Sequence, residues 1–293
     1  MAACKLGNLH SCVRAEAPRF ESEEFWKQYR EWVFAKYAKS WAANLMCYAR
    51  KYHGLLSGNL DELERFSGSK RNNVLQSLIA LAKYLGVYRE FKARMASYGV
   101  KWQRQDSLRA FLRMMQAKGD VLDWVAKAVN VLDDNKATFV KFVAVSGIRA
   151  GEAVKAFTLA IELSQADRLE DYYNSELRSL EHFKYPDRFI RGTKNVFFSF
   201  VPTEFIDKIV ACNTVSYRTL RKHVRKHGLK LRLNELRDYY GTFLVHNGVI
   251  REEVDLLQGR IGKSMFMRHY FSPDIENLRN RVLAAVAKLG VLS

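Results

Sequence analysis

Apolar residues recur at helical spacing along most of this 293-residue chain. Phe25, Tyr29 and Trp32 share one face of a predicted helix, and the same spacing returns between Val74 and Leu85 and through much of the second half. Residues three or four apart lie on one side of an α-helix, so each segment predicts a helix with one buried face. The expected fold class is therefore mainly α.

One stretch departs from helical spacing. Residues 189–191 and 194–201 are rich in aromatic and β-branched side chains, and Gly192-Thr193 lies between them. This composition is typical of two strands joined by a tight turn. We expect a small β-hairpin or sheet inside an otherwise helical domain.

Breaks in the periodicity divide the chain into a tail, two domains and a linker. Residues 1–18 lack a period and predict an N-terminal tail, whereas residues 19–98 predict a small all-helical domain. Residues 99–105 again have no clear period and precede a helix-capping signal, so we interpret them as a linker. Residues 106–293 would form the second, mostly helical domain, which ends in a C-terminal helix.

The chain is strongly basic. It has 48 Lys and Arg against 31 Asp and Glu, which gives a formal net charge of +17. A protein with a positive charge of this size usually binds a polyanion, most often nucleic acid, although an inert basic surface would have the same composition. The expected DNA-contacting cations are Lys70, Arg71, Lys101, Arg104 and Arg191.

Cysteine usage indicates neither a metal site nor a disulfide scaffold. The four cysteines are scattered and form no CxxC pair or Cys/His cluster with zinc spacing. We therefore expect no metal and no cofactor. The chain has no apolar run long enough to span a bilayer, and its N-terminus lacks the apolar core of a signal peptide. A cytoplasmic protein without a membrane partner is expected.

Four short motifs follow one another in the second domain. They are SGIRAGE at 146–152, RGTK at 191–194, LNELRD at 233–238 and LLQGR at 256–260. Together with a later tyrosine, their chemistry-bearing members are Arg149, Lys194, Asn234, Arg237, Arg260 and Tyr270. A phenol with four cations suits metal-free cleavage of a DNA backbone, because fixed cations offset the negative charge of the transition state.

In order and spacing, these motifs resemble the tyrosine recombinases, or phage-type integrases. SGIRAGE resembles the family's first arginine box, and Asn234-x-x-Arg237 resembles its second box with Asn in the usual place of His. LLQGR has Arg260 where most members have His or Trp. The ten-residue offset from Arg260 to Tyr270 is similar to that of archaeal virus and plasmid integrases of the fusellovirus type.

The resemblance covers residues 106–275 by motif and residues 19–98 by pattern. It implies a site-specific DNA recombinase that uses neither ATP nor a divalent metal. Tyr270 would be the nucleophile and would form a 3′-phosphotyrosyl bond. The phosphate oxygens would be held by Arg149, Arg237 and Arg260.

Three further residues have implied roles around this phosphate. Lys194 would protonate the leaving 5′ oxygen as a general acid. Asn234 would donate a hydrogen bond, but an amide cannot shuttle a proton as the usual histidine can. Glu152, one turn after the first arginine, would orient the arginines rather than touch DNA.

The resemblance also implies how the protein would assemble. Two domains would clamp double-stranded DNA attachment sites, a homotetramer would form on DNA in the nucleoid, and a monomer could exist without DNA. The apolar stripe of the last helix, which includes Leu278, Val282 and Val286, would either cover its own domain or dock on a neighbour. Two other functions stay open: a type IB topoisomerase-like enzyme, and a catalytically inactive DNA-binding or architectural protein.

Overall fold

The computed structural model describes residues 20, 22–102, 107–115, 121–191, 195–261 and 265–292. The chain divides into two compact units, residues 1–115 and 116–293. This division groups the short helix α5 (Ser107–Met115) with the first unit, whereas the sequence predicted that these residues belong to the second domain. The functional limits of the two domains stay a prediction.

The first unit is helical throughout its described part. Its elements are α1 (Glu23–Lys36), α2 (Lys39–Tyr52), the 3₁₀ turns His53–Leu56 and Leu60–Arg65, α3 (Gly68–Tyr84), α4 (Tyr88–Ser97) and α5. Tyr29 and Val33 of α1, Leu45 of α2 and Leu81 of α3 are buried in one core. The apolar stripes predicted from the sequence therefore face one another, which is how an amphipathic helix gains stability.

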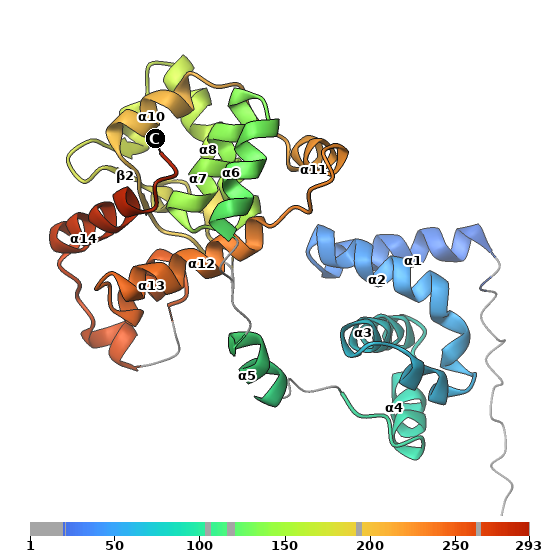
Figure 1. Cartoon of the computed structure of the whole chain (residues 1–293). Helices are drawn as coiled ribbons and strands as arrows, with labels where there is room; N and C mark the ends of the chain where they lie inside the picture. The colour runs from blue at the N-terminus through green and yellow to red at the C-terminus, as the bar shows by residue number, and fades with distance from the viewer. Residues whose placement is uncertain are drawn as a thin grey trace, which may run out of the picture. The chain divides into compact units, whose positions relative to one another are not determined.

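The second unit is a larger helical body. Its helices are α6 (Val121–Val131), α7 (Asp134–Ser146), α8 (Ala150–Gln165), α9 (Pro186–Phe189), α10 (Thr203–Val210), α11 (Tyr217–Lys226), α12 (Leu233–His246), α13 (Arg251–Leu257) and α14 (Ile275–Lys288). Helix α7 packs against α6, α8 and α12, and all four helices belong to the same body (Figure 1). Phe139, Val140, Phe142 and Val143 are all fully buried, so several faces of α7 meet apolar neighbours.

A three-stranded antiparallel sheet completes the described part of this unit. Its strands are β1 (Tyr173–Asn174), β2 (Ser179–Leu180) and β3 (Ser199–Phe200), in that order across the sheet. The predicted small sheet is therefore present, and the mainly α fold is confirmed.

The predicted position of the hairpin is wrong. Residues 186–189 form α9, which begins with Pro186 at a position where a missing N–H costs nothing. Between the described residues of the two arms, where a ladder was expected, the backbone bond is the one from Val196 N–H to the Phe189 carbonyl (3.3 Å). Strand β3 instead pairs with β2, which lies about twenty residues earlier in the chain. Gly192, Thr193 and Lys194 lie outside the described residues.

A buried polar relay ties the sheet to the chain before α9. The Tyr172 hydroxyl lies 2.6 Å from His182 Nδ1, and His182 Nε2 lies 2.9 Å from the Ser199 hydroxyl. All three side chains are buried. Burial lowers the pKa of His182 to about 3, so the imidazole is neutral and one of its nitrogens donates while the other accepts.

The C-terminal helix packs on its own unit. Leu278, Val282 and Val286 of α14 are at most 1% exposed and belong to the core of residues 121–289. Of the two expectations for this apolar stripe, the structure supports the one in which α14 covers its own domain.

No helix in the described ranges has the length and apolar character needed to cross a membrane.

Candidate active site

Three arginines from different parts of the second unit converge. Arg149 is the N-cap residue of α8, Arg237 lies in α12, and Arg260 follows α13. Burial, together with the positive charges of Arg149 and Arg260, lowers the pKa of Arg237 to about 10. The geometry agrees, because Arg237 donates to the carbonyls of Gly147 and Gln258, which lie two residues before Arg149 and Arg260 respectively. The sequence-predicted arginines therefore share one site.

Arg237 is fixed by main-chain carbonyls. Its Nη1 donates to the Gly147 carbonyl at 3.0 Å, and its Nη2 donates to the Gln258 carbonyl at 2.6 Å. The Gln258 amide in turn donates to the Arg237 carbonyl at 2.8 Å. Because neutral acceptors hold the guanidinium, its positive charge is not cancelled and can still act on an anion.

Gly147 makes this arrangement possible. It ends α7 in the left-handed conformation, with φ of 60°, which favours glycine. A Cβ at this position would lie 2.0 Å from the ring of Tyr240. The tight turn therefore needs glycine for its backbone conformation and for the close approach of α12.

A second close approach joins the Arg260 loop to the chain that follows the predicted lysine. The Asn195 carbonyl accepts a hydrogen bond from Arg149 Nη1 at 3.3 Å. A Cβ at Gly259, whose φ is 64°, would lie 1.8 Å from the same carbonyl oxygen. Asn195 therefore contacts both the first arginine and the residue before Arg260. The Arg260 side chain is half exposed, with Nη1 3.7 Å from Asp255.

Glu152 is buried, at 1% exposure, and forms an ion pair with Arg191. The Arg191 backbone N–H also donates to the Asn195 side-chain oxygen at 2.8 Å. The negative charge of Glu152 raises the pKa of Arg237, opposing the two neighbouring arginines. This position fits the expected orienting role of Glu152. Arg191 was expected to contact DNA; its side chain is engaged with Glu152 yet remains 48% exposed.

The structure does not bring Tyr270 to the arginines. Tyr270 ends the π-helical turn η5 (Phe266–Tyr270), between α13 and α14, and is 72% exposed. Its ring contact is with His269, at 6.5 Å between centroids. Among the described residues, no hydrogen bond or ion pair joins its hydroxyl to Arg149, Arg237 or Arg260. Asn234 lies exposed in the first turn of α12.

Two other tyrosines near Arg237 are poorer candidates for a nucleophile. Tyr240 is 2% exposed, and burial raises the pKa of its phenol. Tyr239 stacks on Phe243, with ring centroids 5.8 Å apart, and burial raises its pKa as well. A higher pKa leaves less of the reactive phenolate, and the burial of Tyr240 also blocks its access to DNA. Tyr270 is the accessible phenol of the three.

The predicted DNA contacts of the first unit are only partly exposed. The Lys70 ammonium lies 4.0 Å from the centroid of the Phe66 ring, a cation–π arrangement. Lys70 and Arg71 are half-buried, and Lys101 is exposed. Arg104 lies outside the described residues.

A further basic surface, on α11, was not among the predicted DNA contacts. Helix α11 and the following turn border a hollow of about 540 Å³, lined by Tyr217, Arg221, Arg225, Gly228, Leu229, Lys230 and Leu231. The residues from 211 to 232 include many Lys and Arg and no Asp or Glu. That uninterrupted run is the signal that could have identified this surface.

The described residues hold no cluster of three or more His, Cys, Asp or Glu arranged for a metal ion.

Comparison with known proteins identifies the family. No curated protein matches the chain. The family model described as archaeal phage integrase matches residues 114–277, more than half of the chain. The matched range includes every predicted catalytic position from Arg149 to Tyr270. The protein whose three arginines meet beside α7 therefore belongs to the archaeal phage integrase family.

Proposed function

We propose that this integrase is a site-specific recombinase that cleaves and rejoins DNA through a 3′-phosphotyrosyl intermediate at Tyr270. The observation that supports this most directly is that Arg237 is hydrogen-bonded to the backbone beside Arg149 and beside Arg260, so that the three arginines converge. A phosphodiester is already anionic, and its pentacovalent transition state carries more negative charge. Three fixed cations in one place stabilise that state more than the ground state, as catalysis requires.

The proposed reaction consists of two transesterifications. The Tyr270 phenol loses its proton to solvent and its oxygen bonds to phosphorus, while the bond from phosphorus to the 5′ oxygen breaks. Lys194 donates a proton to that leaving oxygen. In the second step, a 5′-hydroxyl of the partner strand attacks the phosphotyrosine and releases the phenol. One phosphodiester is exchanged for another, so no ATP is consumed.

Arg237, Asn234 and Glu152 would each have a different role in binding the phosphate. Arg237 is held by two carbonyls and would act as the pre-oriented centre of the site. Asn234 lies exposed one turn earlier and would add a neutral hydrogen bond to a phosphate oxygen. Glu152 would keep Arg191 and the arginine cluster oriented.

Basic surfaces of both units would contact the duplex. We expect α11 to bear many of the phosphate contacts of the second unit, because it combines exposed cations with a hollow beside Arg221 and Arg225. In the first unit, Lys70, Arg71 and Lys101 would contribute, and the unit would act as a core-binding domain. The active form would be a homotetramer on DNA, in the cytoplasm and at the nucleoid.

Covalent trapping tests the proposed chemistry. Wild-type protein is incubated with supercoiled plasmid and quenched with detergent, and the trapped strands are sequenced to find the cleaved site. A nicked duplex with this sequence should then accumulate a protein adduct at Tyr270, and Tyr270→Phe should accumulate none. An adduct with Tyr270→Phe, mapped by mass spectrometry to another residue, would move the nucleophile.

The same assay separates the alternatives. Relaxation of plasmid without strand exchange between two sites would indicate a type IB topoisomerase-like enzyme. Tight DNA binding with no adduct from the wild-type protein would indicate an architectural protein and would contradict the proposed function.

A further inference from the structure

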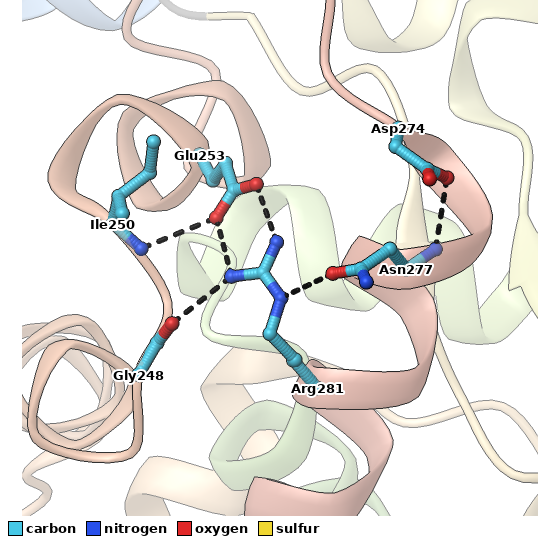
Figure 2. A network of polar contacts seen from close by, with 6 residues as sticks. All are labelled: Gly248, Ile250, Glu253, Asp274, Asn277 and Arg281. Carbon is cyan, nitrogen blue, oxygen red and sulfur yellow. Dashed lines mark hydrogen bonds and ion pairs between the residues drawn. The ribbon is translucent and has the colours of Figure 1, made fainter.

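An ion pair joins the helices on either side of the predicted nucleophile. Arg281 of α14 reaches Glu253 of α13 with both ends of its guanidinium: Nη1 lies 2.8 Å from Oε2, and Nη2 lies 2.6 Å from Oε1. Figure 2 shows the two side chains facing each other in this bidentate arrangement. Planar, two-point contacts of this type fix orientation as well as distance.

Each partner of the pair is itself held. Arg281 Nη1 also donates to the Gly248 carbonyl at 3.0 Å, and its Nε donates to the Asn277 side chain at 2.6 Å (Figure 2). Glu253 Oε2 accepts the Ile250 backbone N–H at 3.1 Å, at the start of α13. The end of α12, the start of α13 and the body of α14 therefore meet at one guanidinium.

This pair differs from an ordinary surface salt bridge. The Glu253 side chain is only 7% exposed, and that of Arg281 is 32% exposed. A carboxylate buried to this degree needs its partner, because an unpaired buried charge is strongly unfavourable. The ion pair therefore has a defined geometry, and breaking it would leave a buried carboxylate without its partner.

Its place in the chain links it to Tyr270. Helix α13 ends at Leu257, and residues 258–274 lead through η5 to α14. At the front of this segment, Gln258 is bonded to Arg237. At its rear, Asp274 accepts the Asn277 N–H at 3.0 Å and caps α14. The Glu253–Arg281 pair joins α13 and α14 outside these two contacts. It therefore connects the two helices that flank the segment carrying Tyr270.

We propose that Glu253 and Arg281 are positioning residues for Tyr270, because they fix both flanks of the segment through which the phenol must reach the arginines. This inference rests on the proposed function. Arg237 is held by the Gly147 and Gln258 carbonyls and Arg149 by the Asn195 carbonyl, whereas the hydrogen bonds of Arg281 within the described residues go to Gly248, Glu253 and Asn277. Opening the pair should therefore impair delivery of the nucleophile and spare the phosphate-binding site.

Arg281→Lys is the central variant, because it keeps the charge and loses the two-point fork. Misplacement of a reacting group by an ångström can cost about a hundredfold, so adduct formation on the trapped duplex should slow by about 10- to 100-fold. Arg279→Lys is the matched control: it lies on the same helix and donates to the Glu176 carbonyl at 2.7 Å, away from α13. It should form the adduct at the wild-type rate.

A tyrosine-independent reaction distinguishes positioning from general support of the fold. In the Tyr270→Phe background, the protein is given a strand ending in a 3′-phosphoryl-p-nitrophenol and a strand with a 5′-hydroxyl. The hydroxyl oxygen bonds to phosphorus, p-nitrophenolate leaves, and the hydroxyl proton passes to solvent. This ligation needs the arginines and no phenol, so adding Arg281→Lys should leave its rate unchanged.

The outcomes separate the two proposals. No adduct from the wild-type protein would refute the proposed function and this inference with it. A wild-type adduct together with an unimpaired Arg281→Lys protein, or with equal losses in cleavage and ligation, would refute the positioning role alone. If Arg281→Lys does not fold, Glu253→Gln carries the test, because it keeps an oxygen for the Ile250 N–H and removes the charge.

Discussion

Arg237 donates a hydrogen bond to the carbonyl of Gly147, which precedes it by 90 residues in the chain. The bond joins the C-terminal turn of α7 to the middle of α12, so the second arginine motif is built on the backbone of the first. Neither residue could hold the site without the other.

Gly147→Ala should damage both the fold and the reaction. The new Cβ would meet the Tyr240 ring at 2.0 Å, and alanine is strained at φ of 60°. We expect a loss of about 1–3 kcal/mol in the free energy of unfolding, and slower DNA cleavage because Arg237 moves with its acceptor. Urea unfolding and adduct formation measure the two effects.

Gly151→Ala is the control for this prediction. Gly151 lies in α8, and a Cβ there would have nothing within 4 Å. Alanine should leave stability unchanged or raise it by up to about 0.5 kcal/mol, because Gly151 lies in the first turn of α8, where glycine costs less than in a helix interior. Equal effects from the two substitutions would show that the turn at 147 tolerates a side chain.

Arg237→Ala should slow cleavage more than Asn234→Ala. The arginine supplies a charge at the developing anion, and its loss should reduce the cleavage rate by about 100- to 1000-fold. It also leaves two buried carbonyls without their donor, so stability should fall by about 1–3 kcal/mol. Asn234 is exposed, and its removal should change stability by less than about 0.5 kcal/mol. Single-turnover cleavage on the trapped duplex ranks the two, and equal rates would contradict the ranking.

Stability should fall on acidification before the carboxylates titrate. The pKa of His182 is about 3 in the folded protein, against an ordinary value of 6.5. Between pH 6.5 and pH 3, the His182 imidazole therefore binds a proton in the unfolded chain but stays neutral in the folded protein. Unfolding free energy should drop by up to about 1.4 kcal/mol per pH unit as pH falls from 6.5 toward 3.

Urea unfolding between pH 7.5 and 5 isolates this contribution, because Asp133 has its pKa held below 3.8 by Lys136 and loses its share only at lower pH. A His182→Asn protein should show a flatter profile over the same range. An unchanged slope would mean that another group takes up the proton.

Charge removal on α11 should reduce the salt dependence of DNA binding. Each phosphate contact adds about 0.9 to the slope of log affinity against log salt, so Arg221→Gln with Arg225→Gln should lower it by about 1.8. Binding to an arbitrary duplex, titrated at several salt concentrations, measures this slope. Arg168→Gln with Lys184→Gln removes the same charge from cations that are ion-paired with Asp171 and Glu181. That control should leave the slope nearly unchanged.

Truncation after Pro273 should abolish the folded second unit. The deletion would remove Leu278, Val282 and Val286 from the core, and each large buried side chain accounts for about 2–5 kcal/mol. Loss of the cooperative thermal transition is the expected result. A truncated protein that still melts cooperatively and binds DNA would show that α14 is dispensable for the fold.

Local patterns predicted the helices well, because burial of one face leaves a period in the sequence. The stripe from Val74 to Leu85 became α3, as expected, and the arginine motif at 149 follows directly after the end of α7. The convergence of Arg149, Arg237 and Arg260 was reached from motif order by resemblance, since no local pattern encodes contacts between residues so far apart.

The hairpin was misplaced because strand pairing is not local. The aromatic run near Phe200 has β-propensity, but its partner Ser179 belongs to a two-residue strand that is too short to leave a period. Propensity therefore predicted a strand and assigned the wrong neighbour. The Glu253–Arg281 pair was equally invisible, since nothing in the sequence says which of many charged residues will meet.

Both acceptors that hold Arg237 belong to the main chain, and this affects how the site can vary. No codon change at 147 or 258 deletes a carbonyl, so the contact cannot be lost by a simple side-chain exchange at its acceptors. A saturation scan of the gene should instead find intolerance where the course of the backbone is decided, at the glycines 147 and 259. What this anion site must keep is therefore the course of its backbone. Substitutions should be tolerated only at residues that leave this course unchanged.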